Sequence, residues 1–236
     1  MANPALNEKL FKRVDAVVDT SRMSINGSVN KTGILLLIAI AGASVGWSGA
    51  SPVLLVAAFL GTLILSMLII FGPQRAVYLS QAYAFGEGVL LGTISATYAE
   101  MFPGIVFNAL ALTLGCLGFT LILYRARIVT VTDKFRSVII VSTLAICMTY
   151  IVDMIMGMFG SGMMMIHQGS TVGIIFSGVV VVVAAMNLFL DFDMIEKLNQ
   201  RGAPKYMEWY CGFALLVTLV WLYLEILRLL SKLNRK

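Results

Sequence analysis

The feature that most constrains this chain is a stretch from Gly33 to Gly72 that contains no charged residue. A membrane-spanning helix needs about 20 predominantly apolar residues, so this stretch is long enough for two such helices. The segment from Trp47 to Pro52, rich in Ser and Gly, predicts a turn between them. Gly42 and Gly46 form a GxxxG pattern, which permits close packing of helices in lipid.

Composition extends this interpretation to the whole chain. Charged residues make up 12% of the sequence and its mean hydropathy is +0.92, whereas soluble domains carry about 25% charged residues. We predict an all-α, polytopic membrane protein with a seven-transmembrane-helix bundle. A polar cytoplasmic tail (residues 1–32) is expected to precede a transmembrane domain (33–231). The expected spans lie near residues 33–49, 53–72, 76–99, 105–124, 137–159, 170–190 and 206–230.

The distribution of cations predicts the orientation. Lys and Arg occur in the N-terminal tail, at Arg75, between the fourth and fifth spans, between the sixth and seventh spans, and at the C-terminal end. The segments after the first, third and fifth spans carry none. Because positive residues favour the cytoplasm, we expect the N-terminus to be cytoplasmic. The cations at the C-terminal end contradict this alternation, so the seventh segment either crosses the membrane, which we favour, or returns to the same side.

Carboxylates lie where lipid would otherwise be expected. Glu87, Asp153 and Glu225 fall inside the third, fifth and seventh spans, and Asp191 and Asp193 end the sixth. An intramembrane carboxylate costs roughly 2.5–3.5 kcal/mol even on insertion scales, and several of them indicate an ion or proton path. Three structural alternatives stay open. The two aspartates could be solvated at a helix end, Glu225 could pair with Arg228, and Glu87 and Asp153 could serve as structural hydrogen-bonding groups.

Other classes of function find little support. No phosphate-binding loop, zinc-protease motif or nucleophile elbow is present, so we expect no enzyme. A methionine-rich segment beside His167 could bind copper, but methionine is also an ordinary filler of apolar gaps. The last span, Tyr206 to Leu230, has no lysine that could form a Schiff base, which excludes a light-driven pump.

Two segments resemble signatures of the Bax inhibitor-1 family of small seven-helix membrane proteins. Leu222-Tyr-Leu-Glu225 resembles the family's Leu-Tyr-Leu-Asp signature in the last helix, and Phe189-Leu-Asp191-Phe-Asp-Met-Ile195 resembles its Leu-Tyr-Asp-x-x-x-Ile signature. Phe85-Gly-Glu-Gly-Val-Leu-Leu91 is a looser match to a Gly-containing stretch of the third helix. The nearest subset is a bacterial branch, which implies the bacterial inner membrane.

The resemblance implies a pH-sensitive calcium leak channel gated by two carboxylates of helices six and seven. The matching pair is Asp191 and Glu225, which would also meet calcium, with Arg75 as the basic partner. Two close carboxylates cannot both ionise cheaply, so they titrate as a coupled pair. Their ionisation would open a path lined by oxygen atoms, the ligands that calcium prefers. Hairpin geometry favours Glu208 over Glu225 as the partner of Asp191, and this alternative stays open.

Two other functions stay open at this point. The same acids could serve a proton-coupled or metal-ion transporter, or they could hold together a non-transporting partner of membrane proteases or stress machinery. The expected partners are the lipid bilayer, calcium ions and other membrane proteins, without nucleic acid. Calcium is expected as the transported ion, and no cofactor is expected. The sequence leaves the oligomeric state and the physiological role open.

Overall fold

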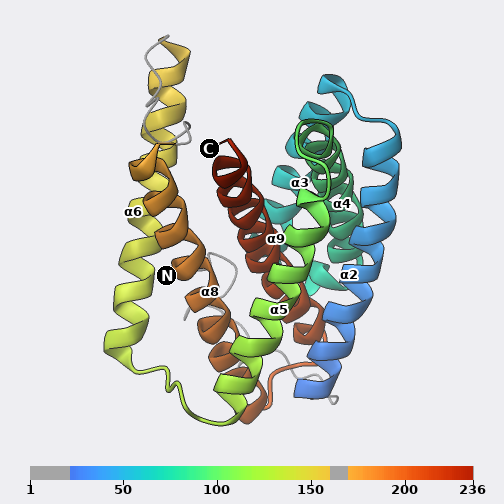
Figure 1. The fold of residues 1–236 in the computed structure, drawn as a ribbon. Helices are drawn as coiled ribbons and strands as arrows, with labels where there is room; N and C mark the ends of the chain where they lie inside the picture. Colours follow the sequence, from blue (N-terminus) through green and yellow to red (C-terminus); the bar gives the residue numbers. More distant parts are fainter. Residues whose placement is uncertain (1–21, 160–169, 236) are drawn as a thin grey trace. The chain divides into compact units, whose positions relative to one another are not determined.

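The computed structural model describes residues 22–159 and 170–235. These residues form seven α-helices and one short 3-10 helix (Figure 1). Their bounds are α2 (Ile25–Ser48), α3 (Pro52–Phe71), η1 (Pro73–Arg75), α4 (Ala76–Met101), α5 (Ile105–Arg125), α6 (Asp133–Met158), α8 (Thr171–Gln200) and α9 (Met207–Asn234). All of the described α-helices except α4 are long and apolar enough to cross a membrane. The prediction of an all-α, polytopic membrane protein with seven helices is confirmed.

Helix α2 begins earlier than the sequence indicates. A polar tail was expected through residue 32, but α2 starts at Ile25. The reason is local, because the Ser24 hydroxyl accepts a hydrogen bond from the Gly27 N–H at 2.9 Å and so forms an N-cap. The last part of the expected tail is therefore helical, and residues 1–21 of that tail lie outside the described residues.

Helix α8 ends later than expected. The sixth span was predicted to stop near residue 190, whereas α8 continues to Gln200. An ion pair of 2.6 Å between Lys197 and Asp193, four residues apart, favours this extension. The turn comes at Gly202, whose φ of 67° suits a residue without a side chain.

Helix α6 begins earlier than expected. It starts at Asp133, four residues before its predicted span, with the Thr132 hydroxyl as its cap.

The chain divides into two compact units. Of the described residues, the first unit, unit 1, contains 102–159, 170–190 and 221–235 and therefore includes α5, α6, the first part of α8 and the last part of α9. The second, unit 2, contains 22–101 and 191–220 and therefore includes α2, α3, η1 and α4 with the remaining parts of α8 and α9. The helices α8 and α9 thus contribute to both units.

Within unit 2, α2 and α4 approach to backbone contact. A Cβ atom at Gly42 or Gly46 of α2 would lie 2.2 Å or 2.1 Å from a backbone oxygen of α4, and one at Gly88 or Gly92 of α4 would lie 2.1 Å from a backbone oxygen of α2. Four small residues therefore permit the contact, and Figure 1 shows the two helices side by side.

Helix α4 is the described long helix that is not apolar enough to count as a membrane span, and many of its side chains are buried. It packs against both α2 and α3. Its buried side chains include Ser80, Glu87, Thr93 and Ser95. Polar groups at membrane depth are tolerated where they face protein rather than lipid, so the burial of α4 accounts for its composition.

Candidate functional site

Asp191 is a buried carboxylate that joins two helices of unit 2. It lies on α8 with 1% of its surface exposed. The Thr218 hydroxyl of α9 donates a hydrogen bond to its Oδ2. A buried carboxylate without donors would lose its hydration without compensation, so this contact is needed for Asp191 to be accommodated.

Glu208 is a second buried carboxylate of unit 2, 3% exposed. It accepts hydrogen bonds from the backbone N–H of Ser24 at 3.0 Å and from the Ser24 hydroxyl at 3.2 Å. Gly27 makes room for it, because a Cβ atom there would lie 2.0 Å from Glu208 Oε1. Glu208 therefore places a negative charge at the N-terminus of α2, where the helix dipole favours it.

Cys211 is fully buried on α9. The carboxylates of Asp191 and Glu208 both act electrostatically on its thiol, which also forms a hydrogen bond with Ser28. Asp191 and Glu208 therefore lie in the neighbourhood of one buried group. Whether Glu208 or Glu225 pairs with Asp191 stays a prediction.

Glu87 is the third buried acid of unit 2, with 7% of its surface exposed. The side chains of Thr62 on α3 and Tyr83 on α4 form hydrogen bonds with it. The ring of Tyr83 meets that of Phe213 on α9 edge to face, with 4.8 Å between the centroids. Glu87 is therefore held by hydroxyl groups from two helices.

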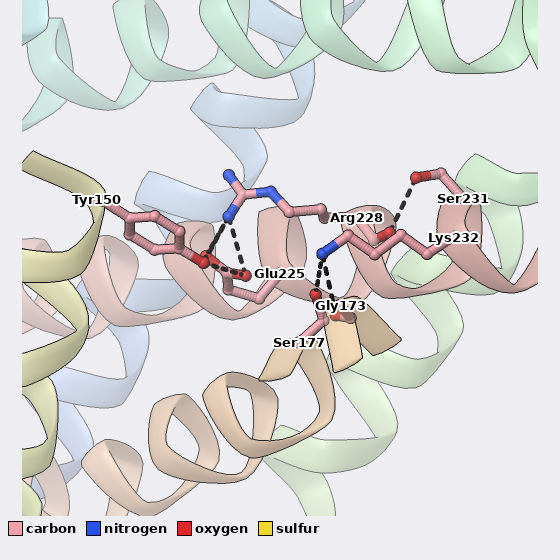
Figure 2. A network of polar contacts seen from close by, with 7 residues as sticks. All are labelled: Tyr150, Gly173, Ser177, Glu225, Arg228, Ser231 and Lys232. Atoms are coloured by element: carbon pink, nitrogen blue, oxygen red, sulfur yellow. Dashed lines mark hydrogen bonds and ion pairs between the residues drawn. The ribbon is translucent and has the colours of Figure 1, made fainter. Parts of the chain in front are cut away.

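Glu225 belongs to a separate network in unit 1, shown in Figure 2. The Tyr150 hydroxyl of α6 lies 3.0 Å from each carboxylate oxygen of Glu225. Arg228 Nη1 donates to Glu225 Oε1 at 3.0 Å and to the Tyr150 hydroxyl at 2.6 Å. The predicted pairing of Glu225 with Arg228 is therefore present. Asp191 and Glu225 fall in different units, and their direct pairing stays a prediction.

The remaining candidates occupy less buried positions. Asp153 is half-buried on α6, almost one turn beyond Tyr150. Asp193 forms the ion pair with Lys197 within α8 and its side chain is 14% exposed, seven residues before the helix ends at Gln200. Arg75 is exposed at the end of η1. The cation beside Glu225 is Arg228 rather than Arg75.

Sequence reasoning missed the partners of these acids. It did not identify Tyr150 as a partner of Glu225 or Thr218 as a partner of Asp191. It also did not identify the burial of Lys232 on α9, which donates to the Gly173 carbonyl at 3.1 Å and to the Ser177 hydroxyl at 2.6 Å. A signal for two of them exists in the sequence. Every seventh residue along one face of α9 is polar or titratable, namely Cys211, Thr218, Glu225 and Lys232.

The described residues include no group of three or more His, Cys, Asp and Glu side chains arranged to hold a metal ion. Most of the methionine-rich segment considered for copper, including His167, lies in residues 160–169, outside the described part of the chain.

Residues 3–235, nearly the whole chain, match the model of a family described as Bax inhibitor 1 like. No curated protein matches the sequence.

Proposed function

Because this chain belongs to the Bax inhibitor 1-like family of membrane proteins, we propose that it is a pH-sensitive calcium leak channel with Asp191 as a gating carboxylate. The observation that carries the proposal is that Asp191, 1% exposed on α8, is bonded to Thr218 of α9. Its charge therefore affects the contact between the two helices to which the resemblance assigns gating.

We propose that Glu208 is the second carboxylate of the gate and that its ionisation is coupled to that of Asp191. Both acids are buried in unit 2, and both act on the thiol of Cys211. Two such carboxylates and a thiol in a water-poor interior cannot all carry charge at low cost. The motif-based partner, Glu225, already has Arg228 and Tyr150 beside it.

The pH dependence follows from the chemistry of the acids. At low pH at least one carboxyl group holds a proton, repulsion is small and the contact between α8 and α9 is closed. As the pH rises, both groups ionise and repel each other. The negative charge also attracts calcium, which prefers oxygen ligands. Calcium flux is therefore expected to increase with pH.

The test is calcium flux into liposomes that contain the purified protein, measured on either side of neutral pH. We expect the flux to rise with pH in the unchanged protein and to stay low at both values in Asp191→Asn, because an amide cannot ionise. Asp193→Asn is the matched control, since Asp193 is on the same helix but pairs locally with Lys197. It should keep the response to pH.

Two results would contradict the proposal. A calcium flux that responds to pH equally in Asp191→Asn and in the unchanged protein would remove Asp191 from the gate. Proton-coupled uptake of another substrate, with no calcium flux under any condition, would instead support the transporter that the same acids could serve. Glu208→Gln and Glu225→Gln, compared in the same assay, identify the acid of α9 that sets the pH response.

A further inference from the structure

Helix α6 is lightly held within unit 1. Only 11% of its most apolar 18-residue window is buried, compared with 67% for α9. Its apolar contacts with α8 include Ile146, which packs with Val180 and Val183, and Phe135, whose ring meets that of Phe189 edge to face. Lipid is as apolar as these side chains, so moving α6 away from them has little hydrophobic cost. The polar contacts of α6 therefore matter most for its position.

The stronger polar contact is the triad of Tyr150, Glu225 and Arg228. The Tyr150 hydroxyl has one proton to donate to Glu225 and a lone pair that accepts from Arg228 at 2.6 Å. The Arg228 guanidinium also lies over the Tyr150 ring, 4.9 Å from its centroid, where a cation is attracted to the aromatic face. Figure 2 shows Tyr150 reaching from α6 to both charged groups of α9.

A second polar contact lies two turns earlier on the same face of α6. The Asn187 Nδ2 of α8 donates to the Thr143 hydroxyl at 3.0 Å and to the Val183 carbonyl at 2.9 Å. The other end of this side chain is not satisfied. Asn187 Oδ1 is buried and accepts no hydrogen bond from any described residue, although Asn187 is only 1% exposed. A buried acceptor without a donor is rare and needs an explanation.

Thr143, Ile146 and Tyr150 lie on one face of α6. This face meets Asn187 of α8 and the carboxylate of Glu225 on α9. An amide oxygen, hydroxyl groups and a carboxylate are the ligands that a partly hydrated divalent cation prefers. The amide oxygen of Asn187 is oriented by the two donations from its nitrogen. It is therefore held ready for a ligand that bears positive charge.

We propose that this α6 face lines the calcium path in unit 1, that the Tyr150–Glu225–Arg228 triad is its closed latch, and that Asn187 Oδ1 is an oxygen ligand for the passing ion. The proposal rests on the calcium leak proposed above. It assigns Glu225 to the latch, with Arg228 as its counter-ion and Tyr150 as the positioning residue that ties α6 to it.

The experiment measures the position of α6 and the flux separately. Ile146→Cys and Val183→Cys, introduced after the native cysteines are replaced by alanine, place two thiols in the contact between α6 and α8. The yield of disulfide cross-link then reports the closed state without any need for calcium. Calcium flux is measured in liposomes that contain the same variants.

Tyr150→Phe removes the latch hydroxyl but keeps the ring. We expect it to lower the cross-link yield at least twofold and to raise calcium flux severalfold under conditions that close the unchanged protein. Thr149→Val is the matched control, because Thr149 is the neighbouring residue on α6, is half-buried, and donates its hydroxyl to the Ala145 carbonyl of its own helix. It should leave both readouts unchanged. Asn187→Leu, which removes the amide oxygen, should lower flux severalfold in the Tyr150→Phe background.

The outcomes separate this inference from the proposed function. An unchanged cross-link yield in Tyr150→Phe overturns the latch, whatever the flux. A lowered yield with no calcium flux in any variant supports the tie between α6 and α9 and rejects the calcium path. If Asn187→Leu does not change the calcium flux of Tyr150→Phe, the amide oxygen is not a ligand for the passing ion.

Discussion

Glu208 lies at the N-terminal ends of two helices at once. It belongs to the first turn of α9, and its carboxylate accepts hydrogen bonds from Ser24, the N-cap of α2. Both helix ends present partial positive charge, so a single carboxylate is favourable to both. This explains how an acid that is 3% exposed is accommodated in an apolar chain. It also ties the start of α2 to the turn before α9, where Met23 N–H donates to the Ala203 carbonyl at 2.8 Å.

We predict that the single substitution Glu208→Gln destabilises the protein. The amide keeps the volume but loses the charge that strengthens the bonds to Ser24, so a loss of about 1–2 kcal/mol is expected. The measurement is the thermal unfolding midpoint in detergent. Glu100→Gln is the control, since Glu100 is exposed at the end of α4 and should change the midpoint little. Equal effects of the two substitutions would contradict the role of Glu208 as a cap.

The contact between α2 and α4 depends on small residues. It has no space for side chains at its closest points, as the distances at Gly46 and Gly88 show. Such contacts gain from close van der Waals packing, which is what drives helix association in lipid. Helix α6, in contrast, exposes most of its apolar side chains. The helices α2 and α6 are thus held by different means.

We predict opposite effects for two alanine substitutions on α2. In Gly46→Ala the new Cβ would lie 2.1 Å from the Val89 carbonyl oxygen, so the helices must separate, and a loss of roughly 1–3 kcal/mol is expected. In Gly33→Ala nothing lies within 4 Å of the new Cβ, and the better helix propensity of alanine should add up to about 1 kcal/mol. Unfolding in detergent measures both. If Gly33→Ala also destabilised the protein, the loss in Gly46→Ala could not be assigned to the contact between α2 and α4.

At the scale of the whole molecule, the expected orientation of the chain depends on whether α9 crosses the membrane. The start of α2 is bonded to Glu208 in the first turn of α9, and the C-terminus follows the last turn. A helix of 28 residues is roughly 40 Å long, enough to cross the bilayer. Three of the four C-terminal cations that contradict the positive-inside pattern have partners among the described residues: Arg228 pairs with Glu225, Lys232 is buried against α8, and Arg235 lies 6.0 Å from the Phe102 ring centroid.

We therefore expect the N-terminus in the cytoplasm and the C-terminus on the other side of the membrane. A single cysteine at Asn234→Cys should react with an impermeant maleimide in intact cells. One at Lys205→Cys, in the cation-rich turn between α8 and α9, should react only after permeabilisation. Both native residues are exposed, so the comparison is matched. The reverse pattern would invert the orientation, and labelling of both from outside would contradict a full crossing by α9.

The sequence by itself determined that the chain is a helical membrane protein and that its acids are exceptional. Both follow from local composition, because the lengths of apolar segments set the spans and the cost of a carboxylate in lipid does not depend on its neighbours in sequence. The helix ends were less predictable, since the caps at Ser24 and Thr132 lie in polar segments that were expected to be a tail and a link.

Only the tertiary structure decided which groups satisfy each acid. Ser24 and Glu208 are 184 residues apart, and Tyr150 and Glu225 are 75 apart. A hydrogen bond forms only within a few tenths of an ångström of its preferred distance, so these partners depend on how α2, α6 and α9 pack. The spacing of residues along the chain does not predict distances between helices. It predicted the pairing of Glu225 with Arg228, one turn away on the same helix. It could not predict the contact of Glu225 with Tyr150, because that contact forms only after the helices have assembled.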